Sequence, residues 1–111
     1  MNKKEQTIED VLAIVIDECG YSFRTISKDD IISKRGDIVL QMTRCIFVTQ
    51  LIHLNYTKPI IAAYLNRTEQ AIDDILCAAH EYKDIRKDWT YLMSEAECTK
   101  RCAEYRNVNF E

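Results

Sequence analysis

The stretch YTKPIIAAYLNRTEQAIDDIL, residues 56–76, decides the fold that we expect for this chain. Its apolar side chains recur at helical spacing on both sides of the polar segment 66–68. Thr57 can cap a first helix whose opening turn accommodates Pro59, and Thr68 can cap a second helix. We therefore predict two short helices joined by a tight turn, a helix-turn-helix. In the DNA-binding form of this motif, the first residues of the second helix meet the bases in the major groove.

The composition indicates one all-α domain over residues 1–111. Hydrophobic residues make up 47% of the chain, which suffices for a single core, while two glycines and one proline provide few turn formers for a β fold. No apolar run has the length of a membrane span, and no cleavable signal sequence follows the first lysines. We therefore expect a cytoplasmic protein that does not enter the membrane.

Further helices are predicted around the motif, for a total of five to six. The longest should cover residues 33–54, with a wide apolar surface and with Gln41 and Arg44 on its polar face. The segment 21–27 should be an extended connector. Helices are also expected at residues 7–19 (capped by Thr7 and ended by Gly20) and at 94–106 (opened by a Ser94–Glu97 capping box), and Ser27 should cap a short turn at 28–32.

Five cysteines occur, and three of them fall in apolar helical stripes. An odd number at such positions is typical of buried reduced thiols rather than of a disulfide framework. Cys77 with His80, and Cys98 with Cys102, also have the spacing of two ligand pairs for a zinc ion. The stripe positions suit buried thiols equally well, so we expect neither a metal nor another cofactor.

The formal net charge is −3, but the basic residues are concentrated. Between residues 28 and 67 six basic side chains stand against three acidic ones, whereas acidic residues are in excess before and after this segment. The positive band therefore ends where the second helix of the motif begins. A weak local excess of this kind also fits an ordinary solvated surface.

Residues 20–83 resemble the C-terminal DNA-binding domain of the bacterial replication initiator DnaA, a relative of the Trp-repressor helix-turn-helix group. The resemblance is carried by SKDDIISKRGDIV (27–39), by MTRCIFVTQLI (42–52) and by Pro59. It implies DNA binding, and it places Arg44 at the arginine with which the family contacts DNA. In the recognition motif Arg67 matches the family, whereas the residues that follow differ from its aspartate, histidine and hydroxyl pair. The family's ATPase domain is not implied, because no GxxxxGK[ST] phosphate loop occurs.

The predicted function is accordingly that of a small DNA-binding regulatory or replication-related factor without ATPase activity. Gln70 can pair with adenine and Glu69 with cytosine, while Asp73 and Asp74 repel phosphate. The alternative is a degenerate helix-turn-helix that serves as a protein-protein interaction module. The residues expected to contact double-stranded DNA are Arg44, Lys58, Arg67, Thr68, Glu69 and Gln70.

Residues 84–111 form a C-terminal extension with a short apolar cluster, Trp89, Leu92 and Met93. We expect this cluster to dock the last helix on its own domain or on a second copy of the protein. The sequence contains no nucleophile elbow, phosphate loop or positioned carboxylate pair, so it does not predict an enzyme.

Overall fold

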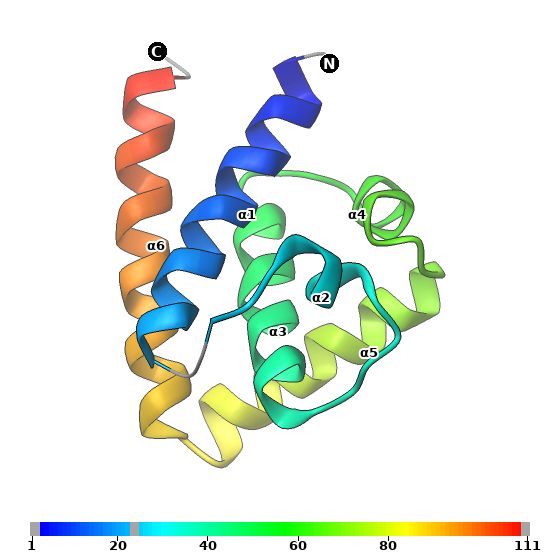
Figure 1. The fold of residues 1–111 in the computed structure, drawn as a ribbon, viewed down its shortest axis with the longest axis vertical. Coiled ribbons are helices and arrows are strands. Elements are labelled where there is room, and N and C mark those ends of the chain that lie inside the picture. Colours follow the sequence, from blue (N-terminus) through cyan, green and yellow to red (C-terminus); the bar gives the residue numbers. More distant parts are fainter. Residues whose placement is uncertain (1–2, 23–24, 110–111) are drawn as a thin grey trace.

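The computed structural model describes residues 3–22 and 25–109, and within these ranges it contains helices and turns but no strand (Figure 1). This confirms the all-α prediction, whereas the relation to the DnaA and Trp-repressor folds stays a prediction. The six α-helices and one π-helix are α1 (Lys3–Ser22), α2 (Lys28–Ile32), α3 (Ile38–His53), α4 (Lys58–Leu65), α5 (Glu69–His80), η1 (Glu81–Ile85) and α6 (Trp89–Asn109).

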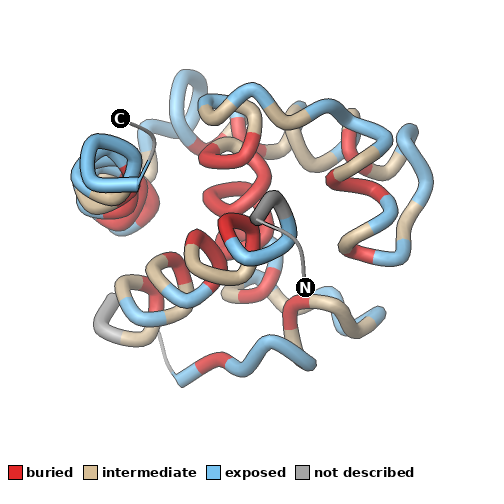
Figure 2. Tube along the Cα trace, turned by 90° about the horizontal axis from the view of Figure 1, so that it is seen from above, coloured by how far each residue is buried: buried red, intermediate tan, exposed pale blue. Residues whose placement is uncertain are grey.

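Helix α3 lies at the centre of the fold, with α1, α5 and α6 packed against it. Every residue from Met42 to Val48 is buried, so this helix has no solvent-facing side over two turns (Figure 2). Helices α1 and α6, which are far apart in the sequence, pack side by side on one flank of α3 (Figure 1). Helices α4 and α5 pack on each other and carry the helix-turn-helix on the other flank.

The first helix is longer than predicted at both ends. It begins at Lys3, so Thr7 is a buried residue inside the helix and not its cap. Because Lys, Glu and Gln are good helix formers, the segment before Thr7 continues the helix toward the amino terminus. Gly20 is helical as well and does not adopt a positive φ. Residues 23 and 24 of the predicted connector lie outside the described residues.

The central helix is shorter than predicted. It begins at Ile38, because the Asp37 carboxylate accepts a hydrogen bond from the Leu40 amide (3.1 Å) and caps the helix there. Residues 33–37 are not helical, so α1 and α6 are both longer than α3. The short turn predicted at residues 28–32 is the helix α2, and Ser27, its predicted cap, forms a reciprocal capping box with Asp30.

The last helix begins at Trp89, five residues before the predicted capping box. The Asp88 carboxylate accepts a hydrogen bond from the Tyr91 amide (2.9 Å) and caps the helix, whereas Ser94 is buried inside it. The residues that α6 buries against the domain are Tyr91, Ser94, Glu95, Cys98 and Cys102.

The prediction that Trp89 and Met93 dock α6 on its own domain is therefore wrong. Both are exposed, and Leu92 is half-buried. The inward stripe has regular helical spacing, but polar and sulfur-containing residues occupy most of it. Hydrophobicity alone therefore predicted that the opposite side of α6 packs on the domain.

One carboxylate joins three helices. Glu9 of α1 accepts hydrogen bonds from the Lys28 ammonium (2.6 Å) and from the Tyr64 hydroxyl (2.8 Å), which belong to α2 and α4. The hydrogen bond from Lys28 holds the pKa of Glu9 below its usual value of 4.5, against the opposing effect of burial. The charged form of Glu9 therefore stabilises the folded state.

We predict that this contribution depends on pH. Because the pKa of Glu9 is lowered on folding, its stabilisation is complete above about pH 5 and is lost as the pH falls below 4.5 toward the folded-state pKa. Glu9→Gln should lower the free energy of unfolding by about 1 kcal/mol at pH 7 and by much less at pH 3.5. Urea unfolding of both proteins at the two pH values measures the difference. An equal loss at both values would contradict the assignment.

Candidate nucleic-acid interface

The helix-turn-helix has the predicted helices and turn. Asn66 closes α4 in the left-handed conformation with φ at 54°, which lets the Arg67 amide bond the Ala62 carbonyl (2.9 Å). The Thr68 hydroxyl accepts a hydrogen bond from the Ala71 amide (3.1 Å), so Thr68 caps α5 as predicted. Thr57 precedes α4 as its N-cap residue, but its side chain makes no capping bond.

Helix α5 buries Ile72 and turns a polar side to solvent. Glu69 and Gln70, the predicted base contacts, are exposed at its amino-terminal end. The Gln70 amide donates a hydrogen bond to the Asp74 carboxylate (3.1 Å), so its side chain is already partnered. The helix contains no lysine or arginine. Its outward surface therefore presents negative charge where the motif would approach DNA.

The predicted position of Arg44 on a polar face of the central helix is wrong, because Arg44 is 6% exposed. Its guanidinium donates hydrogen bonds to the carbonyls of Ile31 (2.9 Å), Asp30 (3.1 Å) and Ser33 (2.9 Å). These carbonyls lie at the end of α2, where helical partners are missing. Burial lowers the pKa of the Arg44 guanidinium, and the charge of Arg67 lowers it further. Arg44 thus holds α2 on α3, and we no longer count it among the phosphate contacts.

Arg67 lies in the turn of the motif and is half-buried. Its guanidinium donates hydrogen bonds to the carbonyls of Ser33 (2.6 Å) and Leu65 (3.1 Å). The Ser33 carbonyl therefore accepts from both Arg44 and Arg67. Through this shared acceptor, the turn of the helix-turn-helix is fixed to the end of α2.

Lys34 is a residue that the predicted site did not include. Its ammonium donates a hydrogen bond to the Asn66 carbonyl (3.2 Å) and thus lies beside the turn. The sequence signal was the basic pair in SKRG, but only the fold brings this segment against residues 66–71. An open cavity of about 500 Å³ occurs here, lined by Lys34, Asn66, Arg67, Thr68 and Ala71.

Lys58 links the two helices of the motif. Its ammonium lies 2.6 Å from the Asp73 carboxylate, and both side chains are about half-exposed. This hydrogen bond raises the pKa of Lys58. A phosphate at this position would have to compete with Asp73 for the lysine.

The cysteines differ in their exposure. Four cysteines are buried, as predicted, but Cys77 is exposed on α5. Among the described residues, no group of three His, Cys, Asp or Glu side chains is arranged to hold a metal ion. The structure therefore does not bring Cys77 and His80 together with Cys98 and Cys102.

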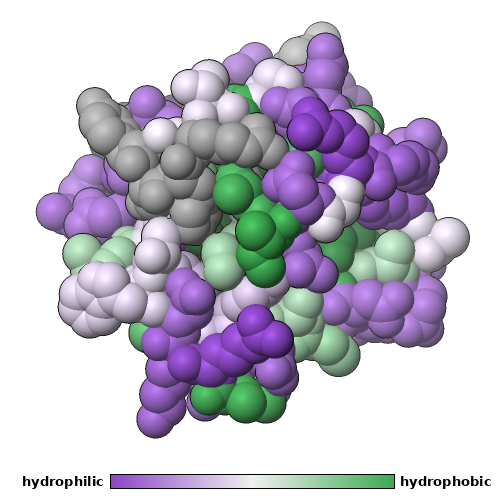
Figure 3. Space-filling model, turned by 60° about the horizontal axis from the view of Figure 1, so that its bottom comes forward, coloured by the Kyte–Doolittle hydropathy of each residue, from purple (hydrophilic) through white to green (hydrophobic). Residues whose placement is uncertain are grey.

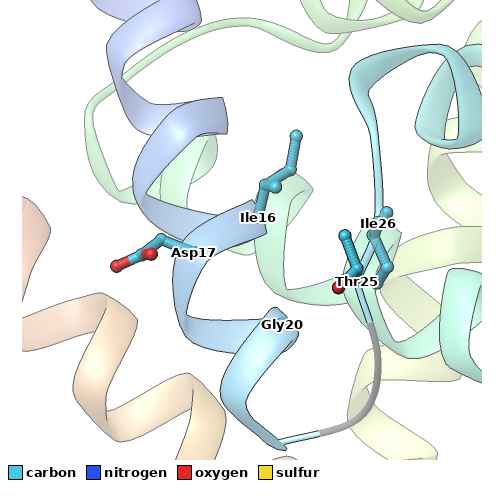
Figure 4. Close-up of a pocket in the computed structure, with 5 residues that line it drawn as sticks. All are labelled: Ile16, Asp17, Gly20, Thr25 and Ile26. Carbon is cyan, nitrogen blue, oxygen red and sulfur yellow. The ribbon is translucent and has the colours of Figure 1, made fainter.

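A second cavity, of about 310 Å³, lies between the end of α1 and the segment before α2 (Figure 4). Its lining includes Ile16, Asp17, Gly20, Thr25 and Ile26. The Asp17 carboxylate points away from Thr25 (Figure 4) and accepts a hydrogen bond from Arg101 of α6 (2.6 Å). These five residues do not provide a nucleophile with an adjacent base.

Comparisons with known proteins give no further assignment: no family model, no curated protein and no solved structure matches this chain. In the part of the chain that the structure describes, no helix combines the length and the apolar character that crossing a membrane requires.

Proposed function

We propose that this protein is a helix-turn-helix factor, regulatory or replication-related and without ATPase activity, that binds double-stranded DNA weakly and mainly through the backbone phosphates. The observation that carries the proposal is the convergence of Lys34 and Arg67 at the amino-terminal end of α5. In DNA-binding helix-turn-helix proteins, this end of the second helix approaches the duplex.

Three features of this location favour an anion. The aligned peptide dipoles of α5 give its amino-terminal end a partial positive charge. Lys34 and Arg67 add two cationic side chains to the lining of the same cavity. Ala71 contributes only a small side chain, so a phosphate oxygen can approach the amides of the helix.

Carboxylates limit the affinity. Glu69, Asp73 and Asp74 stand near the start of α5, and Asp73 neutralises Lys58. A phosphate backbone is repelled by these charges. We therefore expect a dissociation constant in the range of non-specific binding, with Glu69 and Gln70 adding little sequence preference.

The test is fluorescence anisotropy with mixed-sequence duplexes across a salt series. Each phosphate contact adds about −0.9 to the slope of log affinity against log salt. Lys34→Ala with Lys58→Ala should therefore weaken binding and flatten the slope by up to about 1.8. Both lysines are exposed, so the double variant should keep its fold. Asp73→Asn should tighten binding, because it frees Lys58 and removes a repelling charge.

The matched control is Lys100→Ala with Arg106→Ala, which removes the same charge from exposed positions on α6. If this control weakened binding as much as the lysine pair, the attraction would be a general effect of net charge and not of the motif. Absence of binding at the lowest salt concentration would overturn the proposal.

If the protein does not bind DNA, the motif would serve as a protein-protein interaction module. The observation that favours this second function is the acidic outward side of α5, which suits a basic protein surface better than it suits DNA.

A further inference from the structure

A small cavity lies between the end of α3 and the second half of α6. Its volume is about 110 Å³, and we call it the α3–α6 cavity. At the other end of α6, where this helix follows η1, hydrophobic side chains are scattered among hydrophilic ones on the surface (Figure 3). In the α3–α6 cavity, by contrast, both kinds of side chain line one space. The lining includes Gln50, His53, Leu54, Thr99, Ala103 and Arg106.

The polar groups of this lining are mainly hydrogen-bond donors. Gln50 is 1% exposed, and its side-chain amide donates a hydrogen bond to the Thr99 hydroxyl (2.9 Å). Because the Thr99 oxygen is the acceptor in this bond, its own proton is available to a ligand. The Arg106 guanidinium and the His53 imidazole can each donate as well. A ligand that presents acceptor oxygens therefore matches the cavity.

The charge of the cavity favours an anion. The described residues three and four positions from Arg106 on α6 are Cys102, Ala103 and Asn109, so no carboxylate among these helix neighbours neutralises it. Cys102 also lines the cavity, and burial raises the pKa of its thiol to about 11, which keeps the thiol uncharged at neutral pH. The described part of the lining contains no carboxylate.

The dipole of α3 opposes an anion here, because the cavity lies at the carboxyl-terminal end of this helix. Several of the carbonyls at this end already have donors. The Leu54 amide bonds the carbonyls of Gln50 and Leu51 (both 3.1 Å), and the Asn55 amide bonds the Ile52 carbonyl (2.9 Å). These bonds reduce the opposing field, and the rest of it limits the affinity.

The apolar part of the lining and the volume restrict the ligand further. Leu54 and Ala103 offer hydrocarbon surface beside the polar groups. A cavity of about 150 Å³ can hold benzene, which has six carbon atoms. By this comparison the α3–α6 cavity holds about four or five non-hydrogen atoms. The ligand should thus be a very small anion with a short apolar part.

We infer that the α3–α6 cavity binds a short-chain monocarboxylate, such as acetate or propionate. The carboxylate lies against Arg106, His53 and Thr99, and the hydrocarbon end lies against Leu54 and Ala103. The planar fork of a guanidinium matches the two oxygens of a carboxylate. An inorganic anion such as phosphate has no apolar part and leaves the hydrocarbon surface uncovered. For so few atoms we expect a dissociation constant of about 1–10 mM.

The test is a titration of the full chain with sodium propionate at constant ionic strength, without DNA, followed by the chemical shifts of the backbone amides. Amides of residues 50–54 and 99–106 should shift and reach saturation. Propionamide has the same shape but no charge, and it should bind at least about tenfold more weakly, as should inorganic phosphate. Phosphate or propionamide that bound as tightly as propionate would overturn the assignment to a carboxylate.

Two variants locate the site. Arg106→Gln removes the guanidinium and should raise the dissociation constant by about tenfold or more, whereas Lys100→Gln removes an exposed charge of α6 outside the lining and should leave it unchanged. Ala103→Leu keeps every charge but fills the cavity, so it should abolish saturable binding. All three positions are exposed, and unchanged shifts elsewhere in the chain verify the fold.

The outcomes that contradict the inference are equally distinct. Absence of saturable shifts up to about 100 mM propionate would overturn it. If Lys100→Gln weakened binding as much as Arg106→Gln, the attraction would be a general effect of charge. If Ala103→Leu still bound propionate, the ligand would occupy another part of the surface.

Discussion

Replacement of Arg44 by methionine is expected to lower the free energy of unfolding by about 3 kcal/mol, which corresponds to a fall in melting temperature of about 13 °C. Arg44 donates hydrogen bonds to the carbonyls of Asp30, Ile31 and Ser33, and methionine removes all of them. The Asp30 carbonyl keeps its bond from the Ser33 hydroxyl and the Ser33 carbonyl keeps its bond from Arg67, so the Ile31 carbonyl loses the most. Buried acceptors that lose a charged donor cost more than an ordinary hydrogen bond. Thermal unfolding followed by circular dichroism measures the effect.

Arg35→Met is the matched control. Arg35 lies in the segment between α2 and α3, the two helices that Arg44 joins, but it is exposed. Its ion pairs with Asp30 (3.4 Å) and Asp37 (3.5 Å) are long. Its loss should change stability by less than about 1 kcal/mol. Arg44→Lys should fall between the two variants, because a lysine keeps the charge but cannot reach three carbonyls at once. Equal melting temperatures for Arg44→Met and Arg35→Met would contradict the structural role of Arg44.

Phe47→Ala should destabilise the protein still more, by about 3–5 kcal/mol. Phe47 is fully buried in α3, and its ring lies 6.0 Å from the ring of Tyr64 in α4. Removal of the ring leaves a cavity between the central helix and the helix-turn-helix. Because small domains are stable by only about 5–15 kcal/mol, this loss is a large share of the total.

Urea unfolding measures the change, and Phe47→Leu provides the control. Leucine refills most of the space and should lose less than half as much stability as alanine. If alanine and leucine were equally tolerated, the contact between α3 and α4 would not support the fold in the way that the structure indicates.

The helix-turn-helix was predictable because its signals are local. Pro59 suits a first turn, Asn66 readily adopts the left-handed conformation, and Thr68 caps the helix that follows it directly. Each of these residues acts on backbone groups within four positions of itself. The sequence therefore contained all the information that the motif needs.

The starts of the other helices were less predictable, because several residues in each segment can act as caps. Asp37 and Asp88 cap α3 and α6, although the sequence pattern predicts that these helices begin at Ser33 and at the Ser94–Glu97 capping box. The choice depends on which residues tertiary packing buries: Ser94 is taken into the core, and a buried side chain cannot begin a helix at the surface. Such competition is not visible in a local pattern.

The candidate site was predicted only in part for the same reason. The sequence pattern placed Arg44 beside Gln41 on a polar face, and a solvent-facing position follows from that pattern unless distant carbonyls accept hydrogen bonds from its guanidinium. The carbonyls of α2 do so, across a sequence separation of 11 to 14 residues. Lys34 reaches Asn66 across 32 residues. Contacts of this range follow from the fold and not from the spacing of residue types.

The number of residues in the π-helix η1 decides which of its side chains are exposed. Between Glu81 and Ile85 the helix is widened, and the Arg86 amide bonds the carbonyl of Glu81, five residues earlier (2.8 Å). In an uninterrupted α-helix, residues three and four after the buried Tyr82 would lie on the same side as Tyr82. The extra residue in the turn carries Ile85 outward instead. The helix ends after Ile85, and α6 begins anew at Trp89. Deletion of one residue within η1 would therefore rotate only the side chains at the end of this helix by about 100°, and it would exchange buried and exposed positions there without any substitution.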